Sequence, residues 1–154
     1  MHVDEYLLFE ACEDAHEFFA GMMRQRRRAD YWRMVLLDGV DAFGCGDVLP
    51  VTRPLSDPTA SRAVMFATTD SNLRADAQRH VDECELYLGA GLIAVESVRA
   101  GLGAKYADAL DLHYMDGHTE RDTADLMDVS RATVARWIGT ALDWCDYRGR
   151  ELFM

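Results

Sequence analysis

Six residues near the C-terminus have the types and spacing needed to contact a nucleic acid. They are Thr119, Ser130, Arg131, Ala132, Thr133 and Arg136. The fork of an Arg side chain can bind O6 and N7 of a guanine together, and a Thr can meet a thymine methyl or a phosphate. Arg131 is therefore the best candidate for a base contact, and Arg136, one turn later on nearly the same face, for a phosphate contact. Thr119 and Ser130 could bind phosphate, but helix capping is at least as good an explanation of them.

The segment that must position these side chains, residues 104–145, predicts three short amphipathic helices. Thr119 can cap a helix that runs to Met127, a turn follows, and Ser130 caps the next helix, over 130–144. An apolar stripe closes the unit, formed by Val129, Val134, Ile138 and Ala141. The last two helices have the spacing of a helix-turn-helix, in which the second helix lies in the major groove of DNA. The same spacing also occurs in helical bundles that bind no nucleic acid.

Three strings within this segment resemble region 4 of sigma-70-type factors. They are Tyr114-Met-Asp-Gly-His-Thr119, then Ala124, then Val129-Ser-Arg-Ala-Thr-Val134. With Gly103-Ala-Lys-Tyr-Ala-Asp-Ala-Leu110 before them and Ala141-Leu-Asp-Trp-Cys-Asp146 after, the stretch is similar to phage late-gene transcriptional regulators of the ArpU type. The segment Ser56-Asp-Pro-Thr-Ala60 weakly resembles the start of the middle helix in those regulators. The resemblance implies a DNA-binding transcriptional regulator of phage or prophage origin.

Two residues depart from the sigma-type pattern. Asp128 stands where Gly is usual at the turn, which is tolerable because Asp enters the left-handed region more readily than most residues. Thr123 replaces an aliphatic core residue, and we expect it to loosen the packing of the first helix of the pair.

The middle of the chain has the most regular apolar pattern. Apolar or small residues fall at alternating steps of four and three, namely Ala77, Val81, Cys84, Leu88, Gly91, Val95, Val98 and Leu102. This spacing predicts a long helix with one stripe facing a neighbouring helix. Packing on the N-terminal helix of the same chain is the favoured interpretation, and a homodimer through this seam is the alternative. Residues 101–103 end the helix and form a joint before the C-terminal unit.

The N-terminal region, from residue 2 to about 37, is predicted to be helical, with an apolar stripe of Leu8, Cys12, Ala15, Phe19 and Met22. A loop rich in Gly and Pro follows over 38–57. The basic cluster Arg24, Arg26, Arg27 and Arg28 could add phosphate contacts, although partial pairing with acidic residues of 1–20 or of the middle helix is the more ordinary interpretation.

The charge balance argues against binding DNA by charge alone. The chain carries −11 overall, and residues 103–154 hold ten acids against six bases. From 130 to 142, however, the only charges are Arg131 and Arg136. The expected groove face is therefore locally positive, and the unit would need dimerisation, the basic cluster or RNA polymerase beside it to bind firmly.

Other classes of protein find little support. Four scattered cysteines without a CxxC pair fit reduced thiols in a cytoplasmic protein, and no apolar run reaches 18 residues. His80 and Cys84 have helical metal-ligand spacing but lack a second ligand pair, so no metal and no cofactor is expected. No nucleophile elbow, Walker motif or spaced carboxylate pair is present, which argues against an enzyme.

We therefore predict an all-α protein with three regions: 1–56, an N-terminal helical region with a Gly/Pro loop; 57–102, a long helical linker or oligomerisation region; and 103–154, the helix-turn-helix unit. Its expected partner is double-stranded DNA, with RNA polymerase as a further one, and no membrane. Two alternatives remain: a sigma-like module that docks on RNA polymerase or another protein without reading bases, and a DNA-packaging adaptor of the terminase type.

Overall fold

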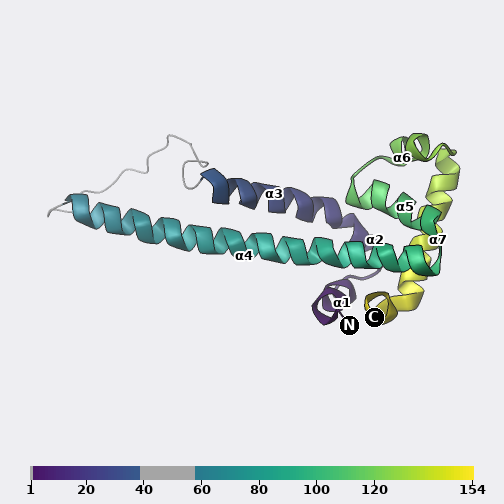
Figure 1. The fold of residues 1–154 in the computed structure, drawn as a ribbon, viewed down its shortest axis with the longest axis horizontal. Coiled ribbons are helices and arrows are strands. Elements are labelled where there is room, and N and C mark those ends of the chain that lie inside the picture. The colour runs from purple at the N-terminus through teal and green to yellow at the C-terminus, as the bar shows by residue number, and fades with distance from the viewer. Residues whose placement is uncertain (1, 39–57) are drawn as a thin grey trace. The chain divides into compact units, whose positions relative to one another are not determined.

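A computed structural model describes the backbone of residues 2–38 and 58–154, and the side chains of 2–37 and 71–154. Within these residues the fold is all-α, as predicted, and contains no strand (Figure 1). No helix among the described residues is long and apolar enough to cross a membrane. Residues 39–57, which hold nearly all of the predicted Gly/Pro loop, lie outside the described part.

The N-terminal region forms three helices: α1 (Val3–Glu10), α2 (Ala15–Ala20) and α3 (Met22–Asp38). Asp14 caps the N-terminus of α2 after the break that follows α1. Its carboxylate accepts a hydrogen bond from the backbone N of Glu17 at 2.7 Å. The predicted apolar stripe faces inward despite this break, because Ala15, Phe19 and Met22 are fully buried and Leu8 and Cys12 partly so.

The predicted long middle helix is α4 (Pro58–Gly101), and it runs without interruption through residues 68–71. The predicted seam residues are buried or half-buried, with Ala77, Cys84 and Val98 fully so. Other parts of the same chain cover this seam: the Cys84 thiol donates to Oε1 of Gln25 at 3.3 Å, and Met22 packs directly over Gly91. The favoured packing within one chain is therefore found, and the homodimer alternative would have to displace these contacts.

The C-terminal unit comprises α5 (Ala104–Leu110), the π-helical turn η2 (Asp111–Met115), α6 (Glu120–Met127), α7 (Arg131–Arg148) and the 3-10 turn η3 (Gly149–Phe153). The predicted joint is present: α4 ends at Gly101, and Gly103 adopts φ 128° before α5. The second helix of the helix-turn-helix is longer than predicted. It continues past 144 to Arg148, because no Gly or Pro follows Gly139 until Gly149, which has φ 50°.

Contacts divide the chain into two compact units, one of residues up to Arg27 together with Cys84–Met154, and one of Arg28–Glu83. Both ends of the chain contribute to the first unit. Phe153 of η3 packs against Phe9 of α1, with ring centroids 5.7 Å apart, and its carbonyl accepts from the backbone N of His2 at 2.9 Å. The domain boundaries predicted from sequence, at 56 and 102, stay a prediction.

The first unit has a single core that fixes the C-terminal helices. Helices α5, α6 and α2 all pack on α7 (Figure 1). The end of α4 joins this core through Ala94, Val95 and Val98. Gly101 lies so close to the indole of Trp144 that no side chain would fit there.

The second unit contains the end of α3 and the beginning of α4. Its described buried residues are Ala29, Val35, Ala77 and Val81. Trp32 stacks on His80 at a centroid distance of 4.5 Å, which holds the two helices side by side within this unit.

Candidate nucleic-acid interface

The two helix starts of the helix-turn-helix are capped as the sequence predicts. Thr119 accepts from the backbone N of Asp122 at 3.1 Å and donates from its hydroxyl to the Asp122 carboxylate at 2.7 Å. Ser130 accepts from the backbone N of Thr133 at 3.2 Å, and the hydroxyls of the two residues lie 2.8 Å apart. Both hydroxyls are thus occupied in capping, and their contact with phosphate stays a prediction.

The turn between the helices is tight. Asp128 adopts the left-handed conformation, φ 54° and ψ 46°, as expected for a residue in the place of a turn glycine. The backbone N of Val129 donates to the carbonyl of Ala124 at 3.0 Å. Ala124 is 3% exposed, so its small side chain is buried where α6 packs on α7.

The core face of α7 also agrees with prediction. Val134, Ile138 and Ala141 are buried, and the half-buried Trp137 packs edge-on against Tyr106 of α5 at 6.4 Å. Trp137 therefore serves the contact between helices in this structure. Thr123 is fully buried on the other helix of the pair, and its hydroxyl has no hydrogen-bond partner among the described residues. The cost at Thr123 is thus an unpaired buried hydroxyl, and the looser packing expected from the sequence stays a prediction.

Arg131 and Arg136 do not share a face, contrary to the prediction. Five residues of α-helix at about 100° each separate them by roughly 140° around the axis. Arg136 lies on the exposed side of α7, opposite the core, with Ala132, Gly139 and Asp143. Arg131 lies nearer the core-facing side and points toward α6, since its Nε donates to Oε2 of Glu120 at 2.9 Å. Its side chain is nevertheless 74% exposed, because it stands in the first turn.

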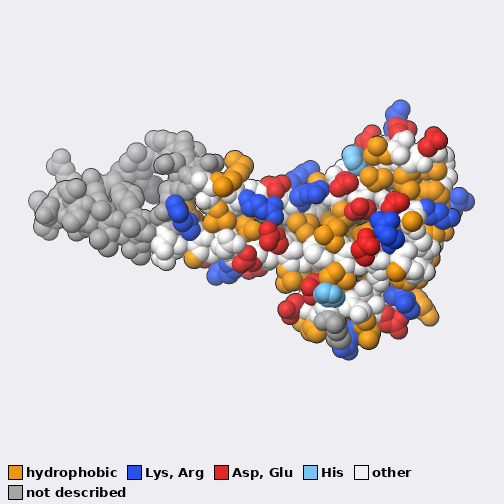
Figure 2. Space-filling view, viewed as in Figure 1, with side chains coloured by type: hydrophobic (Ala, Val, Ile, Leu, Met, Phe, Trp, Pro, Cys, Tyr) orange, Lys and Arg blue, Asp and Glu red, His pale blue; other side chains and the backbone are white. Residues whose placement is uncertain are grey.

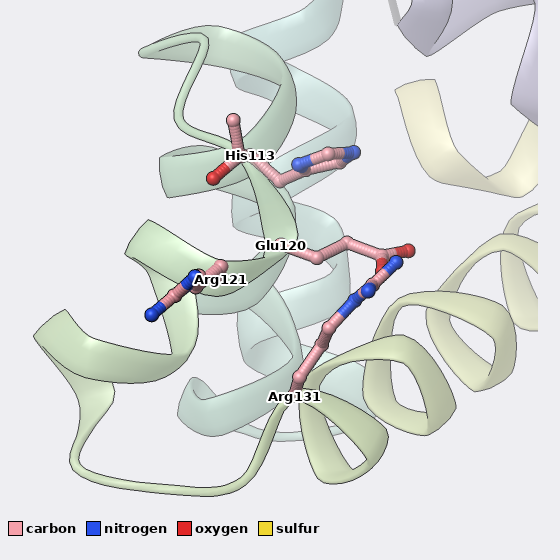
Figure 3. Close-up of a pocket in the computed structure, with 5 residues that line it drawn as sticks. His113, Glu120, Arg121 and Arg131 are labelled. Carbon is pink, nitrogen blue, oxygen red and sulfur yellow. The ribbon is translucent and has the colours of Figure 1, made fainter.

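A surface hollow of about 460 Å³ adjoins this pair, lined by His113, Thr119, Glu120, Arg121 and Arg131. Figure 3 shows the carboxylate of Glu120 and the guanidinium of Arg131 meeting at their tips, whereas Arg121 extends away from them. Nδ1 of His113 lies 2.7 Å from the carbonyl oxygen of His118, which helps to hold the turn before α6. The hollow is thus lined by two cations: Arg131, which is paired with Glu120, and Arg121, which points outward.

Three charged residues at this interface were not predicted from the sequence as part of the site. Glu120 could have been suspected, because it is the first residue of α6 as Arg131 is the first residue of α7. Arg121 is exposed beside the hollow. Lys105 places its ammonium 5.4 Å from the ring centroid of Trp137, so α5 also brings a cation close to α7.

Acidic side chains limit the electrostatic attraction of this surface. In the view of Figure 2, acidic and basic side chains alternate over the described residues instead of forming one basic field. Asp125 and Asp128 on α6 and its turn, and Asp143 on α7, are exposed. This surface therefore offers little non-specific attraction to a polyanion such as DNA.

The predicted basic cluster does not act as one surface. Nη1 of Arg26 donates to the carbonyl of Met115 at 2.5 Å and lies 3.8 Å from Asp116. Arg28 lies 3.8 Å from Glu83 of the middle helix, one of the pairings expected from the sequence. Arg24 and Arg27 are exposed, and a phosphate contact from them stays a prediction.

Metal binding and a reactive cysteine receive no support from the described residues. No group of three His, Cys, Asp or Glu side chains gathers there in a way that could hold a metal ion. His80 lies 2.8 Å from Nη2 of Arg28, and Cys84 bonds Gln25, so both residues have other partners. Burial raises the pKa of the Cys145 thiol to about 12, which keeps it protonated and unreactive at neutral pH.

Comparison with known proteins bears on the same segment. Residues 94–145 match the family model for sigma-70, region 4. The match covers roughly a third of the chain, from the end of α4 through most of α7. It supports DNA binding and transcription regulation in general, and it argues against an enzyme because that domain is not catalytic. The chain matches no curated protein and no solved structure.

Proposed function

We propose that this protein is a sequence-specific DNA-binding regulator of transcription, with α7 lying in the major groove. The observation that carries the proposal is the capped and tightly turned α6–α7 pair, within a segment similar to sigma-70 region 4. As the resemblance to ArpU-type regulators implies, we further propose a phage or prophage origin.

The exposed side of α7 supports docking in a groove. Ala132 and Gly139 flank Arg136 with little side-chain volume, and a Cβ at Gly139 would meet nothing within 4 Å. Small residues let the helix backbone approach base edges closely, and Arg136 can then reach a phosphate or a base. At the start of the helix, Arg131 reads a guanine, while the backbone amides at the start of α7 bind phosphate.

The charge of the chain indicates how firmly this domain holds DNA. Residues 103–154 carry ten acids against six bases, so the unit repels phosphate outside its contact face. We propose that it binds weakly alone and relies on a second protein at the promoter. RNA polymerase is the natural partner for a sigma-like module.

DNA selection from a random duplex pool, at two salt concentrations, tests the proposal. The wild-type protein should enrich one motif. Arg131→Ala should then lose about 1–3 kcal/mol of discrimination at a single base pair. Arg148→Ala is a matched control, because it removes the same charge from the far end of α7, where Arg148 pairs with Glu151. Equal binding of wild type and Arg131→Ala to the selected motif would refute base reading by Arg131.

A second candidate function is docking on RNA polymerase or another protein without reading bases. A hollow of about 410 Å³ beside α6 favours it, lined by Leu112, Leu126 and Met127 with Asp108 and Asp111 at its edge. Leu126 is 60% exposed and lines this hollow beside Leu112 and Met127, so the apolar surface of a partner could cover it. Absence of any enriched DNA motif, together with binding to purified RNA polymerase that Leu126→Asp abolishes, would favour this function.

A further inference from the structure

We propose that Glu120 is a positioning residue that fixes how Arg131 reads DNA and keeps this arginine from binding phosphate indiscriminately. The inference rests on the proposed function and deepens it. Under this proposal, sequence specificity depends on Glu120 of α6 as well as on Arg131 of α7.

The contact joins the first residue of α6 to the first residue of α7. Nε of Arg131 donates to Oε2 of Glu120 at 2.9 Å, and the guanidinium and the carboxylate lie against each other (Figure 3). The side chain of Glu120 is 34% exposed and that of Arg131 is 74% exposed. The carboxylate is therefore the better anchored partner, and the guanidinium keeps access to solvent and to DNA.

The atom that Glu120 engages decides what remains available. A guanidinium has N–H groups along its Nε edge and at its two terminal nitrogens. Because Nε points at Glu120, the terminal Nη1 and Nη2 pair is left at the open end of the side chain. That pair can bind O6 and N7 of guanine together. The ion pair thus selects an orientation of Arg131 compatible with bidentate reading.

Several features hold Glu120 itself in place. It follows the cap Thr119, whose hydroxyl bonds the backbone of Asp122, so the first turn of α6 is well defined. A carboxylate in this turn is also favoured by the positive end of the helix dipole. The left-handed turn at Asp128 then fixes α7 relative to α6. An acceptor on one helix and a donor on the other are in this way held at a constant separation.

A purely structural role explains the pair less well. Exposed ion pairs contribute little to folding, and one partner here is largely in solvent. The pair has a larger effect on binding, since ordering a long side chain on association costs affinity and Glu120 supplies that order in advance. The carboxylate of Glu120 also offsets the charge of Arg131, which weakens its attachment to phosphates of any sequence.

The test measures discrimination at the base pair read by Arg131, and the salt dependence of binding to random DNA, for the full-length chain. Glu120→Ala should lower discrimination about 2- to 12-fold through loss of preordering. It should also steepen the salt dependence of non-specific binding by about one released counterion, because the freed Arg131 can reach phosphate. Glu120→Gln keeps an oxygen acceptor for Nε and should retain more discrimination than Glu120→Ala.

Two comparisons separate this inference from simpler explanations. Asp125→Asn removes one exposed acid from the same helix and should raise non-specific binding without changing discrimination. Adding Glu120→Ala to Arg131→Ala should cause no further loss of discrimination, because the two residues act through one contact. Thermal unfolding checks that each variant is folded.

The outcomes distinguish the inference from the function on which it rests. If Arg131→Ala loses discrimination and Glu120→Ala does not, the positioning role is overturned while the proposed function stands. If Arg131→Ala and Glu120→Ala both bind like wild type, base reading by Arg131 fails and the inference fails with it. An equal loss of discrimination in Asp125→Asn would show an effect of charge alone and would also overturn the positioning role.

Discussion

A substitution at Gly139 should change the stability of the free protein and its affinity in the proposed DNA complex in opposite directions. This glycine lies in the interior of α7, where glycine is normally unfavourable. A Cβ built at this position would meet nothing within 4 Å, so the fold of the chain gives no reason for its absence. Close approach of a partner to the helix backbone gives a reason.

Replacing Gly139 by Leu should therefore stabilise the protein and weaken its complex. A good helix former in place of glycine contributes about 0.5–1 kcal/mol in a helix interior. For a chain of 154 residues this corresponds to a rise in Tm of roughly 1–4 °C. In a tight interface the extra side chain should cost about 1–3 kcal/mol, or roughly a 5- to 150-fold loss of DNA affinity. Differential scanning calorimetry and fluorescence anisotropy on the selected duplex measure the two effects.

Gly89 provides a matched control in α4. A Cβ at Gly89 also meets nothing within 4 Å. Gly89→Leu should thus raise Tm by a similar amount and leave DNA affinity unchanged. The reasoning is refuted if Gly139→Leu binds the selected duplex as tightly as wild type, since the exposed side of α7 could not then lie in the groove.

Two further predictions concern stability. Thr123→Val should stabilise the chain by about 1 kcal/mol, because it removes a buried hydroxyl that has no partner among the described residues. Thr140→Val is the control, because it removes an exposed hydroxyl that bonds the Arg136 carbonyl and should bring no such gain. Urea unfolding measures both changes. Burial raises the pKa of Cys145 from 9.0 to about 12, so the thiol stays protonated in the folded state while it ionises in the unfolded chain. Its contribution to stability is complete below pH 9 and is lost as pH rises from there toward 12; Cys145→Ala should flatten this part of the stability profile, and an unchanged slope would contradict the assignment.

The sequence by itself determined the local structure of the C-terminal unit. The caps at Thr119 and Ser130, the turn at Asp128 and the joint at Gly103 all lie where their residue types place them. Caps and turns can be predicted from the sequence because they depend on hydrogen bonds within three or four residues of the chain. The apolar seam of α4 is equally legible, since its period is fixed by the geometry of one helix.

Tertiary structure decided what meets these elements. The heptad pattern specifies that α4 needs a neighbour, and only the fold shows that Met22 and Gln25 of the same chain cover part of it. Likewise α7 ends beyond the predicted point, and the turn that follows it brings Phe153 against Phe9. These partners lie far apart in sequence, and the pattern of an apolar stripe does not predict which residues will pack against it.

The direction of Arg131 is the clearest case. Its position in the first turn of α7 was evident from the cap at Ser130, and a face shared with Arg136 was inferred wrongly. The fold turns Arg131 toward Glu120, a residue eleven positions earlier on a different helix. A charged side chain on a helix surface can take several rotamers of similar energy, and the neighbour that the tertiary structure supplies selects among them.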